Sequence, residues 1–413
     1  MSNKFSPAKR GATISTIALA FSAALPAQAQ QTVQQQSEVE ALRALIGDLQ
    51  ARLTKLEETQ SAATAAAKTA PKPVTSRNAP VTISGLLQTH ALGYFSQKGP
   101  GARVSDTFRL RRGEIRLTAP ITTRLTGTVM IDPAKNLTQN AAGAINQSSN
   151  IFQELALQYQ LKKTATSSHF IDIGQFKIPI GYEGDQVSSG QLQFVERALI
   201  FAQRDIANGG YGDIRESGVR LRGTSGEIGY DLGVFNGFGE RQNALAATDQ
   251  KAVIGRLFYR PKSVEGLVLG VSGGTGSAGG FDRNVLNAFA AFKKDKWTLQ
   301  SEYLDGKAQG PLGTPPVATL RDIKGYYGSV GYLFTPRIEG TFRYDYFDTD
   351  TALANADAKD ITLGANYYLK GHNAKIQLNL VRRDGNPGAR TGNGANDLRN
   401  DRYELRTNFQ VAF

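Results

Sequence analysis

The segments 338-IEGTFRYDY-346 and 403-YELRTNFQVAF-413 decide the fold. In both, apolar or aromatic residues alternate with polar ones, so a β-strand would place one set on each of its faces. Comparable alternation recurs between residue 81 and the C-terminus, for example in 361-ITLGANYYL-369. Strands of this kind suit either a soluble sandwich or a transmembrane barrel, and the connections between the strands separate these two possibilities.

The connections alternate between short and long along the chain. Outer-membrane barrels have short periplasmic turns and long external loops. Seven short turns and eight long loops require sixteen antiparallel strands, and a barrel of that size encloses an aqueous channel. The sequence therefore predicts an all-β fold, a 16-stranded antiparallel transmembrane β-barrel over residues 81–413. The turns lie near 120–124, 162–168, 224–226, 261–266, 293–296, 335–337 and 370–373, and the loops at 97–106, 132–150, 177–214, 237–250, 273–283, 305–321, 348–359 and 384–401.

The N-terminus has the pattern of a secretory signal peptide. Basic residues precede an apolar run over residues 12–25, and small residues follow at 27–29, which predicts removal of residues 1–29. That apolar run is too short to span a bilayer as a helix. We therefore expect export to the bacterial outer membrane.

Residues 30–60 predict a periplasmic coiled-coil helix. Their apolar residues are spaced alternately by three and four, which forms a heptad seam. A helix of this length is marginal alone, so the seam predicts association, with contact to the cell wall as a further possibility. The alternative is an amphipathic helix docked on the same chain. Residues 61–80, rich in Ala, Thr and Pro, predict an extended linker. The seam consists of Val39, Leu42, Ile46, Leu49, Leu53 and Leu56.

Strand parity predicts which charged side chains point into the lumen. Ile115 and Leu117 would face lipid, which places Arg112 and Arg116 inside, and a one-residue bulge near Arg112 is needed to bring the preceding arginines inside as well. The alternative is that these arginines only keep the wall polar by pairing with Glu114, Glu154, Glu339 and Glu404. The predicted pore-lining, anion-attracting residues are Arg109, Arg111, Arg112, Arg116, Arg220, Arg222, Arg343 and Arg406.

Four stretches resemble the phosphate-selective porin O and P family: 108-FRLRRG-113, 174-GQFKIP-179, 194-FVER-197 and 204-RDIA-207. The resemblance extends over residues 81–413. It implies a homotrimer of 16-stranded barrels, in each of which the third loop folds inward and basic side chains attract small anions such as phosphate. On this basis the constriction loop would contribute Lys177, Glu196, Arg197, Arg204 and Asp205.

The charge balance of that loop favours only a weak preference for anions. It holds more acidic than basic residues, unlike an arginine-rich phosphate site, so a weakly anion-preferring or general pore for small hydrophilic solutes fits better than a phosphate-specific one. The acidic residues are Glu183, Asp185, Glu196 and Asp205, against Lys177, Arg197 and Arg204.

The C-terminal Phe413 resembles the terminal aromatic signal of outer-membrane proteins that the barrel assembly machinery recognises. We therefore expect outer-membrane lipid around the barrel. Three other classes of function compete with a channel. An outer-membrane enzyme would need a histidine with an acidic or hydroxyl partner, and the chain offers only His90, His169 and His372. The second class is a metal site formed by the aspartates of loop 348–360. The third is a structural tether that works through the coiled coil.

Composition narrows these classes. The chain has no cysteine, which excludes disulfides, thiolate metal sites and cysteine nucleophiles. The 48 Lys and Arg residues outnumber the 36 Asp and Glu residues, and removal of residues 1–29 would take away three of the positive charges. We expect no cofactor, no metal and no nucleic-acid partner.

Overall fold

The chain divides into two compact units, Met1–Lys72 and Pro73–Phe413, which are described separately. The predicted signal peptide and most of the predicted linker lie outside the described residues. A computed structural model describes residues 40, 43–55, 57–58, 74–75, 79–101, 103–135, 138–139, 145–146, 151–202, 211–237, 251–278, 281–312, 317–389 and 398–413.

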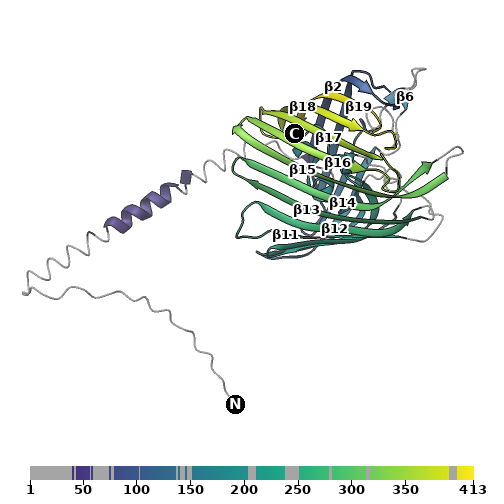
Figure 1. The fold of residues 1–413 in the computed structure, drawn as a ribbon. Helices are drawn as coiled ribbons and strands as arrows, with labels where there is room; N and C mark the ends of the chain where they lie inside the picture. Colours follow the sequence, from purple (N-terminus) through teal and green to yellow (C-terminus); the bar gives the residue numbers. More distant parts are fainter. Residues whose placement is uncertain are drawn as a thin grey trace, which may run out of the picture. The chain divides into compact units, whose positions relative to one another are not determined.

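In the first unit, residues 43–55 form a helix (Figure 1). Arg52 and Asp48 form an ion pair of 2.9 Å one turn apart. The seam residues Ile46, Leu49 and Leu53 are exposed along this helix. The coiled-coil helix predicted over residues 30–60 stays a prediction. No helix in the described part of the chain is long and apolar enough to cross a bilayer.

The second unit is a closed antiparallel barrel of sixteen strands, which confirms the predicted fold (Figure 1). Each strand pairs with the next along the chain, and pairing of the last strand with the first closes the ring. The strands are β2 (Pro80–Lys98), β3 (Thr107–Pro120), β4 (Leu125–Ile131), β7 (Phe152–Lys163), β8 (Ser167–Lys177), β9 (Arg215–Ser225), β10 (Ile228–Phe235), β11 (Ala252–Tyr259), β12 (Leu267–Ala278), β13 (Phe281–Lys294), β14 (Trp297–Leu312), β15 (Val317–Thr335), β16 (Ile338–Asp348), β17 (Asp357–Tyr368), β18 (Ala374–Gly385) and β19 (Asp401–Ala412).

Three short strands accompany the barrel. β1 (Val74–Thr75) pairs with the first residues of β2. β5 (Thr138–Gln139) and β6 (Ile145–Asn146) form a small ribbon between β4 and β7. None of the three contributes to the closed ring.

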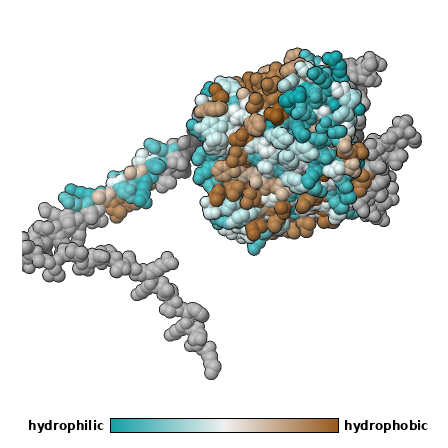
Figure 2. All heavy atoms as spheres, viewed as in Figure 1, coloured by the Kyte–Doolittle hydropathy of each residue, from teal (hydrophilic) through white to brown (hydrophobic). Residues whose placement is uncertain are grey.

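The barrel wall is apolar outside and polar inside. In β17, Ile361, Leu363 and Tyr367 are exposed, whereas Thr362 and Asn366 between them are buried. Figure 2 shows hydrophobic residues gathered over the outer surface of the barrel on the face in view. Exposed apolar residues at alternate positions are what a strand in contact with lipid requires.

The predicted bulge lies in β3 at Arg111. Gln88 of β2 pairs with Arg112, and the next residue of β2, Thr89, pairs with Leu110, so Arg111 has no partner in the ladder. A bulge shifts the register by one residue, which keeps Leu110 outside and turns Arg109 inward.

Two of the predicted loops are wrong in extent, because strands occupy most of both. The region 273–283 is strand except for residues 279–280, which are outside the described residues, and 305–321 is strand except for 313–316. β13 pairs with β14 only as far as Gly306, whereas β14 and β15 stay paired as far as Leu312 and Val317. This hairpin therefore extends beyond the wall, where an apolar outer face is no longer required and alternation gives no signal.

Gly174, within the stretch 174-GQFKIP-179, has a conformation that only glycine adopts readily. Its φ is 125°, and a Cβ there would lie 2.1 Å from the carbonyl oxygen of Leu155 on β7. This glycine lies three residues before the end of β8 at Lys177, and its neighbours stay paired with β7 and β9. The close approach to β7 therefore requires glycine at this position.

We predict that Gly174→Ala destabilises the barrel by about 1–3 kcal/mol, the usual cost of a strained backbone or an overpacked contact. The measurement is the free energy of unfolding in urea with lipid vesicles. Gly328→Ala is the matched control, because a Cβ at Gly328 in β15 meets nothing within 4 Å. Equal stability of the two variants would contradict the assignment.

Candidate functional site

The connection between β8 and β9 folds into the barrel, as the resemblance implied. Its described part contains a π-helical turn at Tyr182–Gln186, a 3-10 turn at Ser189–Gln191 and a short helix α2 at Leu199–Ala202. Side chains of at least nine different barrel strands form hydrogen bonds with the described part of this segment, here called the inward loop (residues 178–214).

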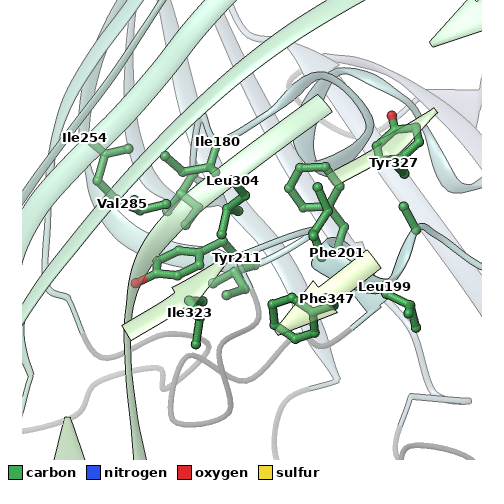
Figure 3. Close-up of a cluster of buried hydrophobic side chains, with 14 of the residues drawn as sticks. Ile180, Leu199, Phe201, Tyr211, Ile254, Val285, Leu304, Ile323, Tyr327 and Phe347 are labelled. Atoms are coloured by element: carbon green, nitrogen blue, oxygen red, sulfur yellow. The ribbon is translucent and has the colours of Figure 1, made fainter. Parts of the chain in front are cut away.

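Apolar packing holds one end of the inward loop to the wall. Loop residues Ile180, Leu199 and Phe201 are buried in one cluster with inward-facing residues of β11 and of β13 to β16 (Figure 3). Burial of each such side chain contributes about 1.5–3 kcal/mol. Sequence reasoning missed this patch, although consecutive apolar residues break the alternation there. The wall contributes Ile254, Val285, Leu304, Ile323, Tyr327 and Phe347.

Buried polar side chains hold the loop backbone. Glu302 of β14 accepts hydrogen bonds from the backbone N–H groups of Tyr182 (2.8 Å) and Glu183 (2.7 Å). Further along, Lys375 of β18 donates to the carbonyl oxygen of Leu192 at 2.7 Å. These anchors were also missed, because parity predicts that a side chain points inward but not what it meets. Asn379 and Asp345 accept from Val195 (2.8 Å) and Leu199 (3.0 Å) in the same way.

The loop presents Glu196 to two arginines of the β3 bulge. Arg111 donates to both carboxylate oxygens, at 2.8 and 3.0 Å, and Arg109 donates to Oε1 at 2.6 Å. Burial would raise the pKa of Glu196, but Arg111 and Arg109 together hold the pKa well below its usual range. Glu196 is therefore ionised at neutral pH.

A second cluster lines β8, β9 and β10. Asp172 accepts from Arg220 at 2.8 Å and from Arg222 at 2.7 Å. Arg220 also approaches Asp231 of β10 to 3.7 Å, and Asp231 pairs with Arg256 of β11 at 2.6 Å. The two arginines predicted on β9 therefore share one carboxylate, which balances part of their charge.

Arg116 of β3 is paired in the same manner. Its guanidinium donates to both oxygens of Glu154 on β7, at 2.6 and 2.9 Å. Arg112, four residues earlier, is fully buried and donates to Gln88 at 2.6 Å. Of these two predicted pore residues, only Arg116 keeps contact with water.

The predicted residues Arg343 and Arg406 are buried in the wall. Arg343 donates to Asp345 at 2.7 Å and to the backbone oxygen of Glu196 at 3.1 Å, so it anchors the loop. Arg406 donates to Glu404 at 2.7 Å. Sequence reasoning missed Arg383 and Arg402, which contact the same Glu404. Both share the inward parity but lie at strand ends that the sequence placed beside loops.

The remaining loop residues stabilise the loop itself. Lys177 forms an ion pair with Asp213 at 2.8 Å, and Arg197 is buried and donates to the backbone oxygen of Val187 at 3.0 Å. Neither therefore projects into open lumen. The predicted residues Arg204 and Asp205 lie outside the described residues.

The ion-pair partners of the arginines match part of the alternative interpretation, in which the arginines keep the wall polar by pairing with four inward-facing glutamates. Glu154 and Glu404 bind predicted arginines, and Glu114 lies 3.7 Å from Arg112. Glu339 instead accepts from Gln193 of the inward loop at 2.8 Å. The lumen is therefore lined by arginine–carboxylate pairs rather than by isolated arginines.

The family model for phosphate-selective porin O and P matches residues 95–284 and 271–413, which together make up most of the chain. The chain belongs to this family. Family and fold together identify a bacterial outer-membrane channel rather than an enzyme. No curated protein matches the porin in sequence.

Several solved structures with the same fold are distant in sequence. An anion-selective porin from Comamonas acidovorans is 15% identical, with a TM-score of 0.53 over 81% of this porin and 100% of the other chain. The outer-membrane channel DcaP of Acinetobacter baumannii is 11% identical, with a TM-score of 0.52 over 83% and 100%. OmpF of Salmonella typhi gives 0.57 at 11% identity over 83% and 100%. At such identities the likeness shows the fold alone.

The three histidines of the porin lie apart from one another. His169 contacts the hydroxyl of Tyr230 at 2.9 Å, His372 lies in the turn before β18, and His90 is buried beside Glu196. In the described part of the chain, no group of three or more His, Asp or Glu residues is arranged to hold a metal ion. The aspartates of loop 348–360 thus form no such group.

We predict that Glu196 stays ionised well below pH 5. Its folded pKa lies below the unfolded value of about 4.3, so its ion pairs stabilise the loop above that pH. This stabilisation is lost only as the pH falls through the lower, folded pKa. The difference in reversal potential between the native porin and Glu196→Gln should therefore be constant from pH 8 down to about pH 4. A difference that has fallen by about half near pH 4.3 would show an undepressed pKa.

Proposed function

We propose that this porin passes small hydrophilic solutes by diffusion and prefers anions. The proposal rests on a difference in side-chain exposure between the arginine and the carboxylate of three ion pairs in the lumen. The side chain of Arg109 is 41% exposed against 17% for Glu196, Arg116 37% against 15% for Glu154, and Arg222 30% against 5% for Asp172. In each pair the arginine side chain is the more exposed partner and the carboxylate the more buried one.

This arrangement supports a preference for anions although the positive and negative charges of the ion pairs nearly balance. A solute in the lumen meets the guanidinium first, and guanidinium groups present several donors to oxyanions. At 4 Å in water one unit charge contributes about 1 kcal/mol, which corresponds to roughly fivefold in partition. Salt screens such a field, so the preference is expected to be moderate and dependent on ionic strength.

Phosphate specificity is less well supported. Each exposed arginine already donates to a carboxylate, so a permeating phosphate would have to compete for donors that are in use. The runner-up is a general porin that also tethers the outer membrane through its N-terminal helix, and the exposed seam at Ile46 and Leu53 favours it.

The remaining features of the proposal concern export and assembly. Residues 1–29 would direct secretion, and Phe413, whose backbone pairs with Gly85 of β2, would be recognised by the barrel assembly machinery. Residues 30–60 would associate in the periplasm and reach the cell wall. We further propose a homotrimer, since OmpT of Vibrio cholerae, which has a similar fold with a TM-score of 0.52, is described in a trimer form.

We predict that Arg116→Gln with Arg222→Gln lowers the anion-to-cation permeability ratio several-fold in 0.1 M KCl. In 1 M KCl the Debye length falls to about 3 Å, so the effect should shrink. The measurement is the reversal potential across a salt gradient in planar bilayers. Arg382→Gln is the control, because Arg382 lies on the outward face of β18 and lies over Tyr403. Equal shifts from both changes would refute a role for the lumen arginines.

A separate prediction tests the N-terminal helix. Ile46→Ser with Leu53→Ser should abolish cross-linking between N-terminal helices in native membranes while the single-channel conductance stays unchanged. Ala44→Ser with Ala51→Ser, off the seam, should leave cross-linking intact. Cross-linking that survives loss of the seam would argue against a coiled coil.

A further inference from the structure

The carboxylate of Glu196 lies where a bound anion would lie. Arg111 holds both of its oxygens and Arg109 holds one of them, within 2.6–3.0 Å. Two guanidinium groups converging on one carboxylate is a common way in which proteins bind carboxylates and phosphates. Here the ligand is part of the chain.

His90 adds an unexplained group at the same place. It is completely buried, and its Nδ1 lies 3.7 Å from Glu196 Oε1. Among the described residues, neither ring nitrogen of His90 has a hydrogen-bond partner. Buried polar groups without partners are rare and usually mark a function, and this one faces the carboxylate between the two arginines.

The backbone beside Glu196 is fixed independently of its side chain. Arg343 donates to the carbonyl oxygen of Glu196 at 3.1 Å, and Asn379 accepts from the N–H of Val195 at 2.8 Å. Removal of the carboxylate would therefore leave the loop in place and empty the space between Arg109 and Arg111.

We propose that His90, Arg109 and Arg111 form a binding site for small carboxylates, and that Glu196 fills it as the channel's own ligand. The inference rests on the proposed function and deepens it. A tethered ligand acts at an effective concentration on the order of millimolar or above, so solutes compete poorly. Because Glu196 occupies the site, permeating anions move past it without saturating it. Glu196 thereby sets the strength of the anion preference.

The test is inhibition of chloride conductance by propionate in planar bilayers at 0.1 M KCl. Glu196→Ala should be inhibited at propionate concentrations at least about tenfold lower than the native porin, because the competing ligand is gone. Glu265→Ala removes the same charge from an exposed periplasmic turn and should behave as native. Equal inhibition of the native porin and Glu196→Ala would overturn the proposal.

A second substitution ties the inhibition to the arginines. Adding Arg111→Gln to Glu196→Ala should abolish the inhibition, and inhibition that persists would place the site elsewhere. If Glu196→Ala fails to fold, Arg109→Gln with Arg111→Gln provides the test. These changes leave the carboxylate of Glu196 uncompensated, so the preference should turn towards cations, and an unchanged preference would overturn the proposal.

Failure of this inference is distinguishable from failure of the proposed function. The reversal potential of the native porin reports anion preference without any substitution. A native porin that prefers anions, with no propionate inhibition in Glu196→Ala, would remove the site at Glu196 and leave the anion channel standing.

Discussion

The anchoring of the inward loop to the inner wall fixes the position of Glu196 and of the arginines that contact the loop. A chain segment inside a barrel must satisfy its backbone polar groups with partners from the wall or from water. Near the start of the loop, Glu302 meets this need by accepting hydrogen bonds from two backbone N–H groups. Further along, Lys375 meets it by donating to a backbone carbonyl oxygen. Apolar loop residues such as Phe201 pack against the wall and remove water from that contact.

The anchoring determines which charges reach the solute. Arg343, which contacts the loop backbone, is buried and bound to a carboxylate. Arg116 of β3 and Arg222 of β9 remain partly exposed. The loop thus selects a small exposed set from many inward-facing arginines, and it adds Glu196 to that set as a counter-charge.

Alternation and loop lengths were enough to predict the barrel, because a wall between lipid and water must alternate at every strand. The same parity predicted the inward direction of Arg220 and the bulge beside Arg112. It could not predict which inward arginines are covered, since that depends on contacts between the loop and strands more than a hundred residues away. Arg383 and Arg402 were missed because alternation weakens at strand ends, where the wall leaves the membrane.

The central claim is that the water-exposed face of the lumen is positive although its charges are paired. The most direct test is the reversal potential of the native porin in a planar bilayer with a tenfold KCl gradient, measured at low and high mean salt. We predict a potential of the sign that chloride selectivity gives, decreasing towards zero as salt increases. A potential of the opposite sign, or one that does not depend on salt, would contradict the account.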